Sequence, residues 1–406
     1  MAHALPSRNA RLLVAGQLLS QVCDKVVAIG AIWIVADRFG GKWIPALVAA
    51  ASLPHLLLFP YAGRIVARWG ALATVIRMDL ARGLLFLAAF VAGRALGEAD
   101  LVYVIYAVSF LAGLGGALFN PAILSLPVAI EKPERVPKVT ALVDVCFSLG
   151  NVLGPVVSVA AYAKAGLDGL FLVNAVSYFY AAALSRAIRP LEASAGEAVA
   201  ETLAADASEP NATIASVLRR YPTAAGMLAC FAFMNLFFAP IQVFIPWFAK
   251  HVYADGIAGV AKLELALGLG TVAGGLVVAW KKLPGSFFLR TFATLGLLCV
   301  SFLCFTRTSS ILEGVVSLFV LGVSLGLVNV VLLGFFQLHP KADHVPFVMS
   351  VVNLVSVAMM PVSMAIIGAW VDDGRMKTLA SVCGWAAIGL LPLLFLVPGI
   401  RTVRDG

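Results

Sequence analysis

Charged residues are scarce in this chain of 406 residues, because Asp, Glu, Lys and Arg together make up only 12% of it. Soluble domains carry about 25% charged residues. Here hydrophobic residues take their place and reach 61% of the sequence. The composition therefore excludes an ordinary soluble domain and predicts an integral membrane protein that crosses the bilayer many times.

The sequence also lacks the patterns of several other classes of protein. Its six cysteines all fall in apolar runs, without the spacing of a disulfide framework or a metal site, and we expect them to be buried small hydrophobic residues. We find no Walker-type loop, no H-E-x-x-H and no G-x-S-x-G in a strand–turn–helix context. We therefore expect neither enzymatic activity nor a cofactor. A cleavable signal peptide is not found either.

Hydropathy windows of about 19 residues predict twelve membrane-spanning helices. Six lie near 11–36, 43–66, 72–93, 101–124, 139–164 and 169–188, and six more lie near 223–249, 258–281, 287–306, 311–334, 345–370 and 378–398. A polar stretch rich in Ala, Glu, Ser and Pro separates the two sets. We predict an all-α membrane fold with one six-helix bundle over 1–188, a cytoplasmic linker over 189–222 and a second six-helix bundle over 223–406.

The positive charges of the loops predict the orientation of the chain. With both termini in the cytoplasm, 18 of the 29 Lys and Arg residues fall on the cytoplasmic side and 9 on the opposite side. Such an excess is typical of cytoplasmic loops. The same bias accounts for the net charge of +8 without a nucleic-acid partner, and we expect none.

The first predicted helix carries charges at the depth where they are most costly. Asp24 and Lys25 lie near its middle, one turn after Gln21. A charge there costs at least about 2.5–3.5 kcal/mol, so it faces the protein interior or water. Asp24 is a candidate proton carrier or counter-charge for a cationic cargo, and Lys25 a candidate contact for an anion or a headgroup. The alternative is a structural pair with each other or with a neighbouring helix.

Other polar residues within the predicted helices are further candidates. His55 is either a titrating group or a satisfied interior residue, and Asp144 is a candidate gate or coupling residue. The uncharged candidates for the lining of a polar cavity are Gln21, Asn235, Gln242, Asn329 and Asn353. Each of these could instead hydrogen-bond a neighbouring helix, which contributes about 0.6 kcal/mol.

The fifth predicted helix contains a G-x-x-x-G-P arrangement formed by Gly150, Gly154 and Pro155. Small residues four apart let two helices approach closely, and a proline within a membrane helix bends it. The arrangement indicates tight packing, a conformational element of transport, or both.

Several short motifs resemble those of the major facilitator superfamily. They are GQLLSQVCD, GRIVARWG, MDLARG, ALFNPAILSLP and GNVLGP, which follow one another through the first five predicted helices. The resemblance covers the whole chain and is strongest to the bacterial drug:proton antiporter branch, which includes macrolide and enterobactin exporters. It implies a transporter that works by alternating access, and none of the motifs is specific for a substrate.

The loop between the second and third predicted helices departs from that family's pattern, which usually reads like G-x-x-x-D-R-x-G-R-K. Arg68 matches, but Ala67 stands where the acidic residue is expected. Asp79 and Arg82 lie one helical turn apart, and we expect them to form an ion pair near the cytoplasmic gate. Together with Arg64 and Arg68 they are the candidate gating network.

Two other families are similar at single positions. Lysophospholipid transporters have an aspartate at the position of Asp24 and an acidic residue near Asp144. Ferroportins have an aspartate at the position of Asp24 that contributes to metal binding, but no accompanying ligand set is present here, so we expect no metal site.

Together these features predict a monomeric, multi-pass transporter of the bacterial inner (plasma) membrane. Its predicted activity is the export of a small amphipathic, drug-like or siderophore-like molecule in exchange for protons. The alternatives are a transporter of lysophospholipid or other lipid without proton coupling, and an exporter of a metal ion or metallophore. The expected partners are the small-molecule cargo, protons and the lipid bilayer.

Overall fold

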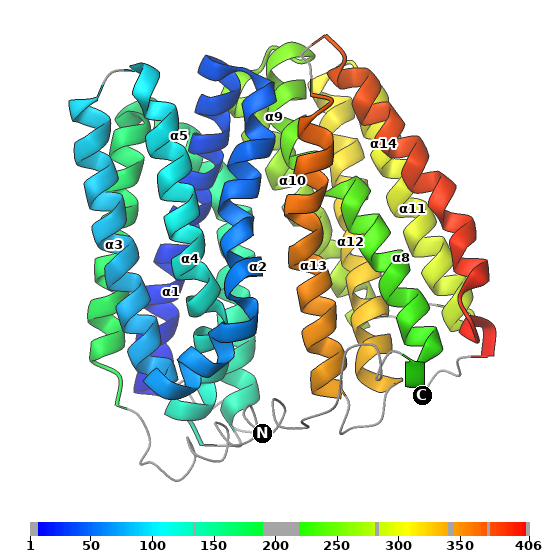
Figure 1. Ribbon diagram of the computed structural model, residues 1–406, viewed down its shortest axis with the longest axis horizontal. Coiled ribbons are helices and arrows are strands. Elements are labelled where there is room, and N and C mark those ends of the chain that lie inside the picture. The colour runs from blue at the N-terminus through cyan, green and yellow to red at the C-terminus, as the bar shows by residue number, and fades with distance from the viewer. Residues whose placement is uncertain are drawn as a thin grey trace. The chain divides into compact units, whose positions relative to one another are not determined.

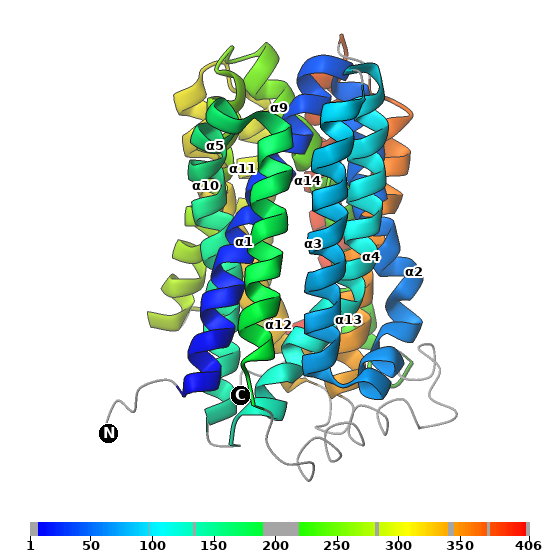
Figure 2. The same cartoon turned by 90° about the vertical axis from the view of Figure 1, so that its left-hand side faces the viewer.

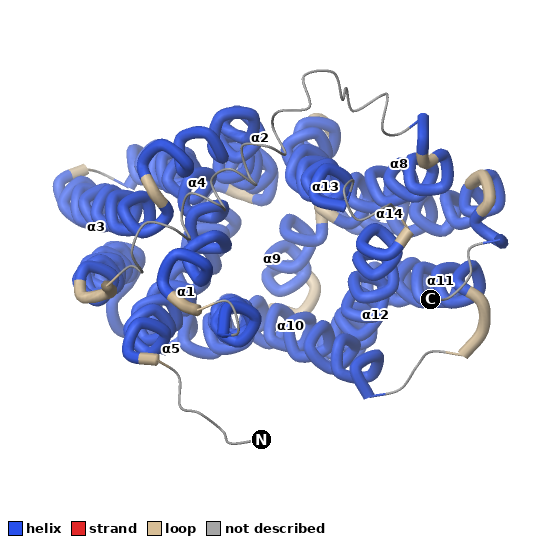
Figure 3. Tube along the Cα trace, turned by 90° about the horizontal axis from the view of Figure 1, so that it is seen from below, coloured by secondary structure: helices blue, strands red, loops and turns tan. Residues whose placement is uncertain are grey.

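The computed structural model describes residues 7–96, 98–132, 135–189, 219–280, 284–339, 345–371 and 374–402. Within these ranges every regular element is a helix and none is a strand (Figure 3). Nine helices of the described residues are long and apolar enough to cross a membrane. In lipid an apolar segment must satisfy its own backbone polar groups, which a helix does. The prediction of an all-α membrane protein is confirmed.

The chain divides into two compact units, which are described separately. Unit 1 comprises Met1–Ile34 and Ala50–Glu209, and unit 2 comprises Val35–Ala49 and Pro210–Gly406. The short segment Val35–Ala49 is held within unit 2 by an ion pair of 2.9 Å between Lys250 Nζ and Asp37 Oδ1. The predicted limits of the two bundles stay predictions, and 190–218 of the predicted linker lie outside the described residues.

Unit 1 is built from long helices that alternate in direction (Figure 1). They are α1 (Arg8–Ile34), the greater part of α2 (Ile44–Trp69), α3 (Ala71–Ala95), α4 (Glu98–Ile130) and α5 (Val136–Arg186). The element α5 is broken at Gly166, whose φ of 62° and ψ of −172° are not helical. A positive φ is readily adopted by glycine. The predicted helices near 139–164 and 169–188 are therefore the two halves of α5.

The helix α1 packs along α5 (Figure 2), and glycines on α5 make the close approach possible. A Cβ atom on Gly150 would lie 3.0 Å from the carbonyl oxygen of Gln21, and one on Gly154 would lie 2.6 Å from the Cβ of Lys25. Larger side chains at these two positions would push α1 away. The G-x-x-x-G part of the predicted motif thus lies in the α1–α5 contact, and Pro155 lies beside it within α5.

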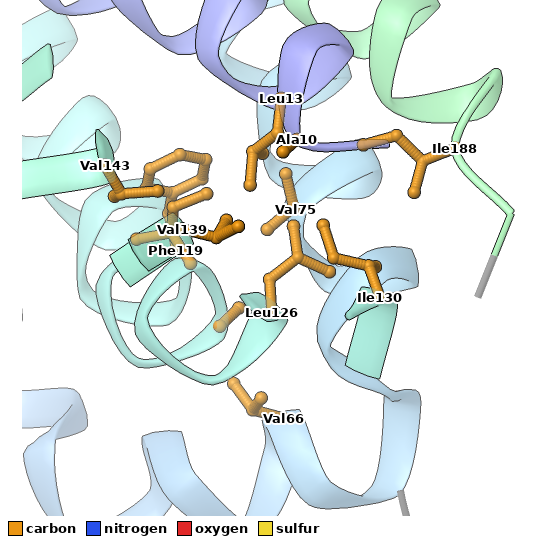
Figure 4. Packing of buried hydrophobic residues seen from close by; sticks show 12 residues of the cluster. Ala10, Leu13, Val66, Val75, Phe119, Leu126, Ile130, Val139, Val143 and Ile188 are labelled. Atoms are coloured by element: carbon orange, nitrogen blue, oxygen red, sulfur yellow. The ribbon is translucent and has the colours of Figure 1, made fainter. Parts of the chain in front are cut away.

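The ends of the unit 1 helices meet in one hydrophobic cluster (Figure 4). Leu13 comes from the start of α1, Val75 from α3, Ile130 from the end of α4 and Val139 from the start of α5. All four are at most 4% exposed. Because lipid is as apolar as these side chains, close packing rather than burial from water holds them together. The cluster fixes the end of the unit that we predict to be cytoplasmic.

Unit 2 contains the second half of the chain. Its helices are α8 (Pro222–Phe238), α9 (Ile241–His251), α10 (Gly256–Trp280), α11 (Phe287–Arg307), α12 (Ile311–Leu338), α13 (Val345–Gly368) and α14 (Met376–Leu390). The single helix predicted near 223–249 is divided into α8 and α9 at Pro240, because proline cannot donate the backbone hydrogen bond that would continue α8.

Glycines also bring α10 and α12 into close contact. A Cβ atom on Gly274 would overlap the carbonyl oxygen of Val323, and one on Gly322 would overlap the carbonyl oxygen of Leu267. Seen end-on, α12 lies between α10 and α11 (Figure 3).

The expectation that all six cysteines are buried is wrong for two of them. Cys230 on α8 is half-buried and Cys304 on α11 is exposed, whereas the other four are buried. A small apolar side chain is compatible with a helix surface that faces lipid, so nothing forces Cys304 inward.

Candidate functional site

Asp24 lies on α1 opposite the second half of α5, where two polar side chains reach it. Its Oδ1 atom accepts a hydrogen bond of 2.5 Å from the Tyr178 hydroxyl and one of 3.0 Å from Asn174 Nδ2. Asn174 is itself held in place, because the Ser177 hydroxyl donates to its Oδ1 atom at 3.2 Å. These partners fix one oxygen of the Asp24 carboxylate and leave Oδ2 to interact elsewhere.

Arg82 on α3 connects Asp24 to a second carboxylate. Its Nη2 atom lies 2.8 Å from Asp79 Oδ1, and its Nη1 atom lies 3.9 Å from Asp24 Oδ2. The guanidinium group also lies 4.1 Å from the ring centre of Phe119 and 4.4 Å from that of Tyr178. Arginine stacks on aromatic faces while its edge donates hydrogen bonds, and Arg82 does both. We call Asp24, Asp79, Arg82 and Tyr178 the charge cluster of unit 1.

The local sequence explains how so large a side chain fits inside the bundle. Asp79 and Arg82 are three residues apart and therefore share one face of α3. On α4, which packs beside α3, a Cβ atom on Gly115 would lie only 2.9 Å from Arg82 Cγ. The glycine leaves the space that the stem of Arg82 occupies. Phe119, one turn further along α4, supplies the ring beneath the guanidinium.

The three charged side chains differ in their access to solvent. The side chain of Asp79 is fully buried and that of Arg82 is 7% exposed, whereas that of Asp24 is 30% exposed. Asp79 Oδ2 has no hydrogen-bond partner among the described residues. With both carboxylates ionised, the cluster carries two negative charges and one positive charge. One proton or one cationic group at Asp24 brings it to neutrality.

The structure brings together Asp24, Asp79 and Arg82 from the predicted site residues. His55 on α2 faces α4, where a Cβ atom on Gly116, the residue after Gly115, would lie 3.1 Å from His55 Nε2. Asp79 and Arg82 were expected at the cytoplasmic gate. The expected ion pair between them is present, and Arg82 also contacts Asp24, so the pair lies beside Asp24. Its predicted role in gating stays a prediction.

The other predicted charged site residues of unit 1 are half-buried or exposed. Lys25 is half-buried and packs against Gly154 through its stem. Asp144, Arg64 and Arg68 are exposed. Their predicted roles in gating or coupling stay predictions.

The predicted polar lining divides between the two units. Gln21 Nε2 lies 3.5 Å from Gln17 Oε1 in unit 1. In unit 2, Asn235 and Asn329 line a common cavity, and Gln242 is half-buried on α9. The side chain of Asn353 lies outside the described residues.

Three important residues of the site were not predicted from the sequence, namely Asn174, Tyr178 and Phe119. Asn174 and Tyr178 are four residues apart in an apolar run, so they share a helix face, and Ser177 adds a third polar group. That spacing is a signal that could have been used. No pattern in the sequence marks Phe119 as the ring beneath an arginine.

Comparison with known proteins assigns the family. The family model of the Major Facilitator Superfamily matches residues 13–363. The chain belongs to this superfamily. Superfamily membership confirms the predicted twelve-helix fold and identifies the chain as a membrane transporter rather than an enzyme.

Comparison with individual proteins shows distant similarities. A protein of Bacillus subtilis (strain 168) named "Putative bacilysin exporter BacE" is 24% identical over 167 residues, which are 41% of this chain and 38% of that protein. Crystal structures of the peptide transporter POT match with a TM-score of 0.70 for a mutant in complex with alafosfalin and 0.66 for a complex with sulfate. Both are 17% identical, covering 97% of this chain and 96% of theirs. At such identity the structures establish the fold alone.

Proposed function

We propose that this superfamily member is a proton-coupled exporter of a small amphipathic molecule, drug-like or siderophore-like. The two predicted six-helix bundles would rock about a site near the middle of the membrane, as in other secondary transporters. The observation that supports the proposal is the charge cluster of unit 1, in which two carboxylates share one guanidinium inside a membrane bundle.

The charges of the cluster give a physical basis for exchange. Asp24 is its most exposed member, and its contact with Arg82 is the longer of the two, at 3.9 Å against 2.8 Å. A proton on Asp24 weakens that contact and leaves Arg82 paired with Asp79. A cationic group of the cargo neutralises Asp24 equally well. Proton and cargo therefore compete for one carboxylate, which is the condition for coupling their movements in opposite directions.

The direction and location are inferred from separate features. The excess of Lys and Arg on one side supports cytoplasmic termini, and the partial similarity to a protein named as an exporter supports outward transport. We propose a monomer in the bacterial inner membrane. The drug:proton antiporter branch is the part of the superfamily in which we place it.

The test is transport into everted membrane vesicles that carry the overexpressed chain. A panel of cationic drugs, siderophores and lysophospholipids is offered with and without a protonophore. We expect saturable uptake of a cationic or siderophore-like compound that the protonophore abolishes. Uptake of a lysophospholipid that is insensitive to the protonophore would replace the proposal by the lipid-transporter alternative. Uptake of a free divalent metal ion, offered to a parallel set of vesicles, would favour the metal-exporter alternative.

A further inference from the structure

Unit 2 has an open surface groove of about 720 Å³ beside the short connection between α11 and α12. Leu303, Cys304 and Arg307 line it from the last turns of α11, and Leu312 and Glu313 line it from the first turn of α12. With the predicted cytoplasmic termini, this connection lies on the non-cytoplasmic side of the membrane. The groove therefore lies where a charged residue can reach the lipid headgroups.

Trp385 reaches the groove from α14, because a glycine lets that helix approach α11 closely. A Cβ atom on Gly384 would lie 3.2 Å from the Cα atom of Leu303. Trp385 is 55% exposed, and the Arg307 guanidinium lies 5.9 Å from the centre of its ring. Tryptophan is enriched where a membrane meets water, and arginine near the end of a membrane helix directs its charge to the same level. The two side chains mark the level of the headgroups.

The guanidinium group of Arg307 has its hydrogen-bond donors available. Arg307 is exposed, and it forms neither an ion pair nor a hydrogen bond with any described residue. Arginine presents five N–H donors in a planar fork that matches the oxygens of a phosphate group. At the level of the headgroups, the phosphate of a phospholipid is the anion that the surroundings supply.

Glu313 contributes a negative charge to the same groove. Its Oε2 atom accepts hydrogen bonds from the backbone N–H of Ser309 at 2.8 Å and from the Ser309 hydroxyl at 3.2 Å. These bonds hold the carboxylate at the start of α12. Its Oε1 atom accepts no hydrogen bond from the described residues, and the carboxylate does not pair with Arg307. The groove thus presents a cation and an anion that do not neutralise each other.

The rest of the lining is mainly apolar. Leu312 and Val316 lie one turn apart on α12, and both are exposed, as is Cys304 on α11. In a membrane such side chains face acyl chains rather than water. The groove therefore fits a ligand that carries both signs of charge at one end and is apolar at the other.

We propose that this groove binds one phosphatidylethanolamine molecule of the surrounding bilayer. The lipid phosphate accepts hydrogen bonds from Arg307, its ammonium group donates to Glu313 Oε1, and the start of an acyl chain covers Val316. The inference does not rest on the transport function proposed above, because the groove is built from unit 2 alone and binds a lipid that stays in place.

The carboxylate decides which phospholipid fits best. The ammonium group of phosphatidylethanolamine carries three N–H donors, as a lysine side chain does. The quaternary ammonium group of phosphatidylcholine has no N–H to donate to Glu313. Phosphatidylglycerol satisfies Arg307 but brings no cation to Glu313. We therefore expect phosphatidylethanolamine to bind more tightly than either.

Cys304 reports whether the groove is occupied in the purified full-length protein. N-ethylmaleimide is added in detergent micelles that contain phosphatidylethanolamine or phosphatidylcholine, and mass spectrometry of the peptides gives the rate of alkylation. A bound lipid slows the reaction by mass action, about fivefold when phosphatidylethanolamine is present at about four times its half-saturating amount. Phosphatidylcholine at the same mole fraction should slow it less. Cys230, which is half-buried on α8 and outside the groove, should react equally in both lipids.

Three variants assign the protection to the proposed contacts. Arg307→Met keeps the apolar stem but removes the phosphate donors, and it should abolish the protection of Cys304. Glu313→Gln keeps the shape of the side chain but removes its charge, and it should reduce the protection by phosphatidylethanolamine to the level of phosphatidylcholine. The matched control is Arg375→Met, because Arg375 is exposed at the start of α14 and does not line the groove. It should leave the protection intact.

Native mass spectrometry provides a second, independent measurement. The wild-type chain should retain one phosphatidylethanolamine molecule more than Arg307→Met does. The inference is overturned by equal protection from phosphatidylethanolamine and phosphatidylcholine, by stronger protection from phosphatidylglycerol, or by Arg307→Met that matches the wild type in either assay. Because no transport is measured, such a result removes this site without deciding the proposed function. Loss of transport in Asp24 variants, with protection of Cys304 intact, would in turn leave the lipid site assigned.

Discussion

Replacing Arg82 by methionine removes the one cation that two interior carboxylates share. Methionine keeps most of the apolar stem that packs against Gly115, so the main change is electrostatic. Asp79 is left fully buried, with its 2.8 Å partner gone. Breaking a buried ion pair by removing one partner costs about 3–5 kcal/mol, because the remaining charge is uncompensated.

The expected loss of stability is large enough to measure by thermal unfolding in detergent. For a cooperative unit of about 200 residues, 1 kcal/mol lowers Tm by about 2–4 °C, so Arg82→Met should lower it by about 6–20 °C. The control is Arg94→Met on the same helix, where the arginine is exposed and should contribute less than about 1 kcal/mol.

The double variant tests whether the buried charge of Asp79 is the cause. Asp79→Asn combined with Arg82→Met removes both members of the pair, and removing a whole buried pair is often close to neutral. We therefore expect the double variant to recover more than half of the lost Tm. The reasoning fails if Arg82→Met unfolds at the same temperature as Arg94→Met, or if the double variant is as unstable as Arg82→Met alone.

Three further predictions concern packing, hydrogen bonding and orientation. Gly274→Ala should destabilise unit 2 by about 1–3 kcal/mol, because the added methyl group overpacks against α12. The control is Gly275→Ala, where a Cβ atom meets nothing within 4 Å and Tm should not change. Equal Tm values for the two variants would contradict the α10–α12 contact. Tyr178→Phe removes the donor to Asp24 but keeps the ring over Arg82. It should lower the free energy of unfolding by about 1–2 kcal/mol and weaken the coupling of cargo to protons without preventing folding. A variant with wild-type Tm and wild-type coupling would show that this hydrogen bond is dispensable. A membrane-impermeant maleimide on spheroplasts should label Asp100→Cys above the level of the parent chain and should not label Ser7→Cys; the reverse pattern would mean that the termini lie outside.

The interior charges of α1 could be predicted from the sequence because their cost in lipid is high. A carboxylate in the middle of an apolar run needs partners that offset the cost of its charge. The partners of Asp24 are Arg82, Tyr178 and Asn174. The spacing of Asp79 and Arg82 likewise predicted their ion pair. What the spacing could not show is which neighbour that face of α3 meets, and so the pair was expected near Arg64 and Arg68 instead of beside Asp24.

The uncharged partners were harder to predict for a physical reason. A single Asn or Tyr in a membrane helix carries a small cost and commonly bonds a neighbouring helix, so Asn174 and Tyr178 did not stand out. Gly115 is one of 36 glycines, and only the packing of α3 beside α4 shows that it makes room for Arg82. Residues whose role depends on a partner from another helix require the fold.

The most direct test of the central claim is proton movement in proteoliposomes that contain the purified chain and a trapped pH-sensitive dye. A transported cargo is added to wild-type protein, to Asp24→Asn and to Asp100→Asn, whose aspartate is exposed on α4. We predict a cargo-induced proton flux in the wild type and in Asp100→Asn that disappears in Asp24→Asn, while exchange of labelled for unlabelled cargo across the membrane persists. A full proton flux with Asp24→Asn would contradict the assignment of coupling to Asp24.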